Sequence, residues 1–180
     1  MKTCWMLVVM LALAVSARAP AAQAGNPVVV LETGKGTIQI ELFEQDAPKS
    51  VAQIVRLVKQ NFYRGLRFHR VERSLAQFGD PNSRVFTKRH LWGSGGSGRQ
   101  IGVAEIGKAR KHVRGAVGLA HSGDPKRADS QFYIMKAASP SLDGKHAVIG
   151  QVISGMDVVD KLAVGDMVTK ASVKGAVPQP

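Results

Sequence analysis

The chain has 180 residues, of which 44% are hydrophobic and 21% charged, and it carries 25 Lys and Arg against 13 Asp and Glu. A length of this order suits one domain, and the composition excludes a disordered chain, a collagen-like repeat and a disulfide-stapled mini-protein. The formal charge of +12 leaves an anionic partner open, and a single cysteine excludes an internal disulfide.

The first 24 residues are typical of a secretory signal peptide. Lys2 precedes an apolar run over residues 5–15, and Ala22-Gln23-Ala24 forms an A-x-A cleavage site before Gly25. The apolar run is too short to span a bilayer comfortably, which disfavours an uncleaved anchor. Cleavage removes the only cysteine, two basic residues and no acid, so the domain of residues 25–180 carries a charge of +10. We therefore predict an exported, thiol-free domain without stable membrane insertion.

The start of that domain predicts a β-hairpin followed by a helix. β-branched runs at residues 28–32 and 37–42 flank a glycine turn, and the second run alternates apolar with polar residues, so one face is expected to be buried. Asp46 is a candidate N-cap with Pro48 in the first turn, and apolar residues then recur at the helical spacing up to about Gln60.

The rest of the chain predicts short strands separated by turns, with one further helix. The strands are expected at residues 65–71, 75–78, 116–120, 131–135 and 147–153, and the helix at residues 155–164. A long surface loop, of the kind that is usually functional or mobile, is expected at residues 82–100. Many short strands with only two helices favour a closed or nearly closed β architecture over alternating βαβ units, and no domain boundary is evident.

Several common functional motifs are matched only in part, or lack the neighbouring elements that their function requires. Gly93, Gly95 and Gly98 match G-x-G-x-x-G, but no strand is predicted before them and no helix after them, which disfavours a nucleotide site. The five histidines lack metal-ligand spacing, and no G-x-S-x-G elbow is present. The basic run over residues 108–114 has no interleaved aromatics, so we interpret it as a solvated basic face rather than a specific nucleic-acid site.

Three ordered blocks carry a stronger signal. Phe-His-Arg at residues 68–70 leads into Leu-Ala-Gln-Phe-Gly-Asp at 75–80, Ser-Gln-Phe follows at 130–132, and Leu-Asp-Gly-Lys-His at 142–146. In these blocks the sequence resembles the cyclophilin family of peptidyl-prolyl cis-trans isomerases, in order from about residue 28 to residue 162. The resemblance implies a mainly β fold, a closed eight-stranded antiparallel β-barrel capped by two α-helices. It also implies an enzyme that needs no metal or cofactor.

The resemblance implies that Arg70 is the catalytic group and that Gln77 orients it and contacts the substrate backbone. Rotation about a peptide bond meets a barrier of roughly 18–20 kcal/mol because the nitrogen lone pair is conjugated with the carbonyl. At the twisted transition state that conjugation is lost and the prolyl nitrogen accepts a hydrogen bond better, so a fixed cationic donor stabilises this state most. The guanidinium of an arginine is always charged, and a second hydrogen-bond acceptor can fix its orientation. Without the resemblance, an arginine at this position reads as solvent-facing.

The family pattern further implies a proline pocket and a main-chain contact to the peptide. The implied substrate-binding residues are Leu75, Ala120, His121, Gln131, Tyr133, Leu142 and His146. Tyr133 stands where the family usually has Phe, Leu75 where it has Met, and His121 where it has Asn. From the residues alone, Tyr133 and Leu142 are equally compatible with barrel core, and His146 with a turn histidine.

Departures from the family pattern leave two functions open. Ser74 replaces a large pocket Phe and Ser141 replaces a Trp associated with cyclosporin binding, so a shallower pocket, weaker inhibitor binding and lower activity are expected. The first function is a monomeric isomerase, periplasmic or secreted, that acts on proline-containing peptides and helps exported proteins fold. The alternative is a peptide-binding or chaperone module of the same fold with little isomerase activity, whose binding to unfolded or acidic clients weakens with salt.

Overall fold

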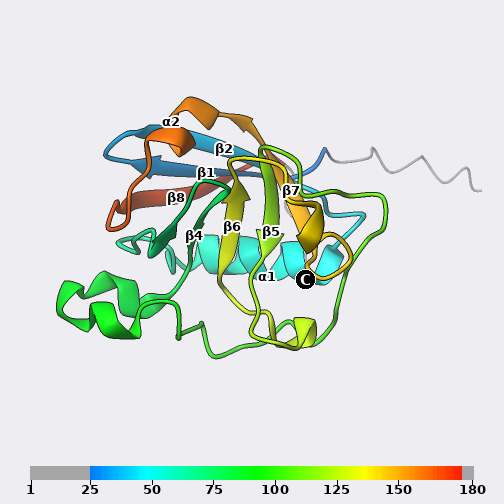
Figure 1. The fold of residues 1–180 in the computed structure, drawn as a ribbon, viewed down its shortest axis with the longest axis horizontal. Coiled ribbons are helices and arrows are strands. Elements are labelled where there is room, and N and C mark those ends of the chain that lie inside the picture. The colour runs from blue at the N-terminus through cyan, green and yellow to red at the C-terminus, as the bar shows by residue number, and fades with distance from the viewer. Residues whose placement is uncertain (1–24, 176–180) are drawn as a thin grey trace, which may run out of the picture.

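Eight strands form one antiparallel sheet that curls into a barrel, with two helices packed against it (Figure 1). The computed structural model describes residues 25–175, so the predicted signal peptide at 1–24 lies outside the described residues. The sheet order is β3-β4-β6-β5-β7-β2-β1-β8. The elements are β1 Val28–Thr33, β2 Gly36–Leu42, α1 Pro48–Lys59, β3 Arg70–Val71, β4 Leu75–Phe78, β5 Ala116–Leu119, β6 Phe132–Met135, β7 Val148–Ser154, α2 Met156–Lys161 and β8 Val168–Lys174, with short 3-10 helices η1 Pro81–Arg84, η2 Phe86–Leu91, η3 Pro125–Arg127 and η4 Pro140–Leu142. The predicted eight-stranded, two-helix architecture is confirmed.

The hairpin of β1 and β2 and the helix α1 form where the sequence predicts them, but α1 is capped differently. Its N-cap residue is Ala47, with no side-chain cap of its own, and the predicted cap Asp46 instead pairs with Arg110 at 2.7 Å. The carboxylate of Glu105 accepts the free backbone N–H groups of Lys49 and Ser50 at 3.0 and 2.8 Å. The prediction of Asp46 as cap was wrong because a carboxylate distant in sequence takes the orphan donors of the first turn.

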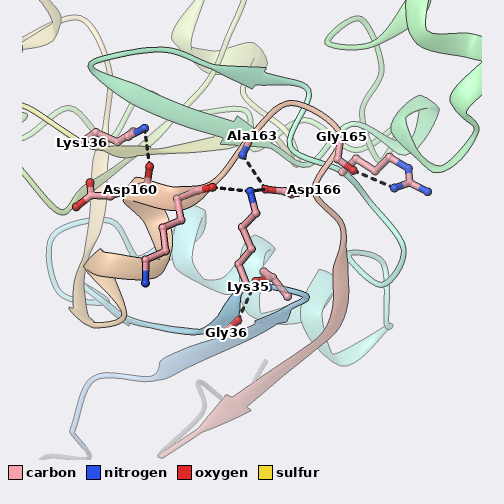
Figure 2. A network of polar contacts seen from close by, with 10 residues as sticks. Lys35, Gly36, Lys136, Asp160, Ala163, Gly165 and Asp166 are labelled. Carbon is pink, nitrogen blue, oxygen red and sulfur yellow. Dashed lines mark hydrogen bonds and ion pairs between the residues drawn. The ribbon is translucent and has the colours of Figure 1, made fainter.

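The two ends of the sheet meet through segments that lie outside its regular ladders. β3 contains only two residues, and the preceding residues 65–68, predicted as strand, bond to residues 165–168 at the start of β8. Figure 2 shows how side chains reinforce this closure: Lys35 reaches Asp166 at 2.8 Å and the carbonyl of Lys161 at 2.5 Å, while Arg67 donates to the carbonyl of Gly165 at 2.9 Å. The β1–β2 turn, the C-terminal end of α2 and the segment before β3 are thereby joined.

One hydrophobic core fills the barrel and extends under both helices. It takes apolar residues from every strand except β3, together with the buried face of α1 and Val158 and Val159 of α2. In Figure 1, α1 and α2 lie on opposite sides of the curled sheet, so each covers a different opening. Burying a Val or Leu side chain contributes roughly 1.5–3 kcal/mol, so these faces hold the helices in place.

Three further predictions about helices, strands and loops need correction. β8 was missed, and the loop expected at residues 82–100 contains η1 and η2, which project from the body of the barrel in Figure 1. The second helix is also shorter than predicted, ending at Lys161. Within residues 25–175 no helix is both long and apolar enough to cross a membrane.

Candidate active site

Four neighbouring strands place a row of residues on the face of the sheet that is turned away from the barrel interior. Arg70 of β3 pairs with Gln77 of β4, Gln77 with Tyr133 of β6, and Tyr133 with Gly118 of β5. Cross-strand partners share a face. Side chains alternate along a strand, and the residues on either side of Gln77 and Tyr133 belong to the barrel core. The row therefore lies on the outer face of the sheet, exposed at Arg70 and buried at Tyr133 and Gly118.

The guanidinium of Arg70 is half exposed and held at two of its three nitrogens. Its Nε donates to Glu72 Oε1 at 2.7 Å and its Nη1 to Gln77 Oε1 at 3.4 Å, and 51% of the side chain is exposed. Its Nη2 has no hydrogen-bond partner among residues 25–175. An exposed ion pair of this kind contributes about 0–1 kcal/mol to stability, so its main effect is to orient the group. Both N–H donors of Nη2 are therefore left without a partner in the described part of the chain.

Gln77 is itself fixed by a chain of amide hydrogen bonds. Its Nε2 donates to Gln131 Oε1 at 2.9 Å, and Gln131 Nε2 donates to the carbonyls of Gly93 and Gly95 at 2.9 and 2.7 Å. The fully buried Asp80 accepts the N–H of Gly93 at 2.5 Å from the same loop. The glycine-rich segment is therefore tied to the site, and it lines a hollow of about 260 Å³ beside Gln77 and Gln131.

The predicted pocket residues form a small apolar cluster of their own, separate from the barrel core. Leu75 and Tyr133 are 5% and 3% exposed, and Ala120 and Leu142 pack against them. Tyr133 and Leu142 thus belong to this outer cluster, Leu142 as a partly buried member, and not to the barrel core, which was the alternative that the residues left open. Phe132, the neighbour of Tyr133, points into the barrel core instead.

A buried histidine that the sequence analysis did not single out supports this apolar cluster. His112 is 2% exposed, and its Nε2 lies 3.0 Å from Tyr133 Oη while its Nδ1 lies 2.9 Å from Asp143 Oδ1. Because a carboxylate accepts, Nδ1 carries the proton and Nε2 accepts from the Tyr133 hydroxyl. Burial raises the pKa of Tyr133, which keeps that donor protonated, and the backbone and ring N–H groups of His112 lower the pKa of Asp143. His112 lies in the basic run at residues 108–114, so its interpretation as part of a solvated face was wrong.

The two remaining histidines of the candidate site stack on each other at its rim. The rings of His121 and His146 lie 4.2 Å apart, His121 Nε2 is 3.0 Å from the carbonyl of Lys145, and His146 Nδ1 is 3.1 Å from that of Leu119. Burial, followed by the neighbouring His121 and His112, lowers the pKa of His146. The backbone N–H of Ala120 bonds to Gln131, whereas that of His121 makes no hydrogen bond within residues 25–175. The backbone N–H of His121 is thus available as a hydrogen-bond donor.

The structure brings all nine predicted site residues to one face. Ser74 and Ser141, which stand where the family has aromatic residues, lie at the edge of the apolar cluster. Ser74 is half-buried and its carbonyl accepts the N–H of Lys136 at 2.7 Å, whereas Ser141 is exposed beside Ser139. Neither fills the apolar cluster. No three His, Cys, Asp or Glu side chains of residues 25–175 are arranged to hold a metal ion.

Comparison with known proteins agrees with this geometry. The family model of cyclophilin type peptidyl-prolyl cis-trans isomerases matches residues 28–178. The chain is 41% identical over 160 residues to a probable peptidyl-prolyl cis-trans isomerase of Brucella suis, covering 85% of this chain and 81% of that relative. It is 39% identical over 141 residues to an isomerase of Helicobacter pylori, covering 77% and 81%. A cyclophilin type isomerase of Cryptosporidium parvum, whose crystal structure was determined in the presence of the dipeptide Ala-Pro, superimposes with a TM-score of 0.71 at 24% identity, over 82% of this chain and 98% of that chain.

Proposed function

The chain belongs to the family of cyclophilin type peptidyl-prolyl cis-trans isomerases and has that enzyme activity, and we propose that it uses Arg70 to rotate X-Pro bonds in exported proteins. The observation that carries the assignment of Arg70 is its free Nη2, on a guanidinium whose other two nitrogens are bound to Glu72 and Gln77. These two acceptors fix the orientation of the planar guanidinium. The donor is therefore oriented before a peptide arrives.

The residues around Arg70 bind the proline ring and the peptide backbone of the substrate. The proline ring packs on the cluster of Leu75, Tyr133 and Leu142, and His146 forms its wall. The peptide backbone binds the free amide of His121 and the side chains of Gln77 and Gln131. As the prolyl nitrogen becomes pyramidal it accepts a hydrogen bond from Arg70 Nη2, which stabilises the transition state more than either isomer. No covalent step or proton transfer is required.

The catalytic assignment is tested by measuring isomerisation of a short X-Pro peptide. Arg70→Ala is expected to lower kcat/KM by about 10²–10³-fold, the loss typical of removing a transition-state donor. Arg70→Lys keeps the charge but not the fork and is expected to recover little. Arg73→Ala, an exposed arginine three residues along the chain, is the matched control and should retain activity. Wild-type activity in Arg70→Ala would reject the role of Arg70.

Export is supported by the basic start, the apolar run and the A-x-A site within residues 1–24. We place the mature, monomeric enzyme in a periplasm, where it assists the folding of exported chains; secretion from the cell is the alternative. Fractionation of a Gram-negative host that expresses the full chain should find the protein in the periplasmic fraction with Gly25 at its N-terminus. An uncleaved protein in the cytosol would contradict this localisation.

A further inference from the structure

A second, larger hollow lies between α1 and the segment of residues 99–101. Its volume is about 690 Å³, and it is open along one side of the helix. Val55 and Ile101 contribute apolar walls, while Lys49, Arg56, Lys59 and Arg99 bring four cationic side chains to its surface. We name this hollow, with these residues, the α1 groove.

The cations of the α1 groove are not paired with carboxylates in the part of the protein that the structure describes. No carboxylate lines it, and none of its four cations forms an ion pair within residues 25–175. Arg56 is bound only to the neutral side chains of Gln53 and Gln60. Two carboxylates lie next to the groove without lining it: Glu105 accepts the backbone N–H groups of Lys49 and Ser50, and Asp129 lies 3.5 Å from Gln53 Nε2 and accepts the N–H of Gly98 at 3.0 Å. Four cations without an ion pair, beside an apolar wall, favour an anionic ligand with aliphatic parts.

The α1 groove adjoins the hollow of the candidate active site. Gln100 lines both, and Gln53 of α1 donates to the carbonyl of Arg99 at 2.8 Å, which fixes the wall between them to the helix. Gln77 and Gln131 line the other side of the smaller hollow. An extended polypeptide that is bound at Gln77 and Gln131 and continues over Gln100 would therefore reach the α1 groove.

We propose that the α1 groove is a second docking site for the client polypeptide and that it binds an acidic, extended segment near the proline. Binding of an acidic segment in the α1 groove does not depend on the proposed function. Only the link between this binding and catalysis at Arg70 rests on it. Asp and Glu side chains pair with the four cations, and aliphatic side chains pack against Val55 and Ile101. Two linked contacts raise the effective concentration of the proline at Arg70, so acidic clients bind better than neutral ones.

Direct binding is measured by fluorescence anisotropy with a short dye-labelled peptide that alternates Glu with Val and contains no proline. Wild type and Arg70→Ala should bind it equally, and the same peptide with Gln in place of Glu should bind much more weakly. Lys59→Glu/Arg99→Glu is expected to lose about tenfold in affinity and Lys59→Gln/Arg99→Gln less. Raising the salt from about 10 mM to 100 mM shortens the Debye length from about 30 Å to about 10 Å and should also weaken binding.

The matched control is Lys88→Glu/Lys174→Glu, which changes the net charge equally at two exposed lysines outside the α1 groove and should bind as wild type does. The proposal is overturned if the wild type does not bind the acidic peptide, if the control loses as much affinity as the groove variant, or if the groove binds anionic vesicles or a single-stranded oligonucleotide in preference to the peptide. Thermal unfolding verifies that each variant is folded, and the Gln variant avoids placing Glu at the C-terminal end of α1.

The coupling to catalysis is measured with an Ala-Pro peptide extended by an acidic or a Gln-containing tail. The acidic tail should lower KM for the wild type and not for Lys59→Glu/Arg99→Glu, while both enzymes turn over the short, tailless peptide with the same kcat. An equal KM for both tails in the wild type would show that one client does not bind the α1 groove and the active site together. Failure of Arg70→Ala to lower turnover would reject the catalytic assignment and leave the proline-free binding result unaffected, so the two failures are distinguishable.

Discussion

Tyr133→Phe removes a single buried hydroxyl from the floor of the proposed proline pocket. That hydroxyl lies 3.0 Å from His112 Nε2, and the two residues are 3% and 2% exposed, so water does not readily replace the lost donor. His112 is held on its other side, because Asp143 Oδ1 accepts from its ring and from its backbone N–H at 2.9 and 2.8 Å. The imidazole therefore has little freedom to find another partner.

The expected cost follows from that geometry. Leaving a buried acceptor without a hydrogen bond costs about 1–3 kcal/mol. For a domain of this size each kcal/mol lowers Tm by about 2–4 °C, so Tyr133→Phe should unfold roughly 2–12 °C below the wild type. The phenyl ring that faces the proline is retained, so kcat/KM on a short X-Pro peptide should change only a few-fold.

The assay is urea and thermal unfolding of the four proteins of a double-mutant cycle, with His112→Leu as the second change. In the His112→Leu background the Tyr133→Phe substitution should cost much less, giving a coupling of about 0.5–3 kcal/mol, the range found for residues in contact. Equal costs in both backgrounds, or a Tyr133→Phe protein as stable as the wild type, would show that this hydrogen bond does not support the pocket.

Three further substitutions test other contacts. Gly118→Ala should raise KM and lower Tm, because the new Cβ would lie 2.5 Å from the Tyr133 ring and a clash in a packed region costs about 1–3 kcal/mol; unchanged values would refute it. Glu105→Ala should cost about 1 kcal/mol in urea unfolding through loss of the α1 cap, whereas Asp46→Ala, the control, should cost less. The unfolding free energy should fall as pH drops below about 6.5, because the folded state lowers the pKa of His146 and the unfolded chain then binds more protons. His146→Gln should flatten this slope, leaving the part due to His69, and an unchanged slope would contradict the assignment.

Elements with a strong short-range pattern were predicted with nearly the bounds that they have. β4 has the predicted bounds, Leu75–Phe78, and α1 follows the helical repeat of Val51, Ile54 and Val58. β8 was missed because only Val168 and Ala171 of its seven residues are buried, which leaves no alternation to detect. Residues 65–68 have the composition of a strand, but their backbone partners are residues 165–168, which no local pattern reveals.

The candidate site was found through its motifs, and its supporting contacts required the structure. Arg70 and Gln77 are close in sequence and face each other across one hairpin, so the distance between them is a local property. The segments that fix Gln77 come from distant positions, since Gln131 and the carbonyls of Gly93 and Gly95 complete the chain of hydrogen bonds. A prediction from motifs therefore identifies the groups that contact a substrate more readily than the groups that hold them.

Tyr133 shows how the unusual residues of this chain depend on one another. A tyrosine where the family usually has phenylalanine adds a hydroxyl to a buried ring, and a buried hydroxyl requires both space and a partner. Gly118, its cross-strand neighbour, provides the space, since any side chain there would overlap the ring. His112 provides the partner, and Asp143 fixes the tautomer in which His112 accepts. Nothing in the sequence relates Gly118, His112 and Asp143 to Tyr133, and only the fold brings the four residues together. In other chains of this fold, a tyrosine at this position should therefore be accompanied by a small residue across the ladder and by a buried acceptor beside it.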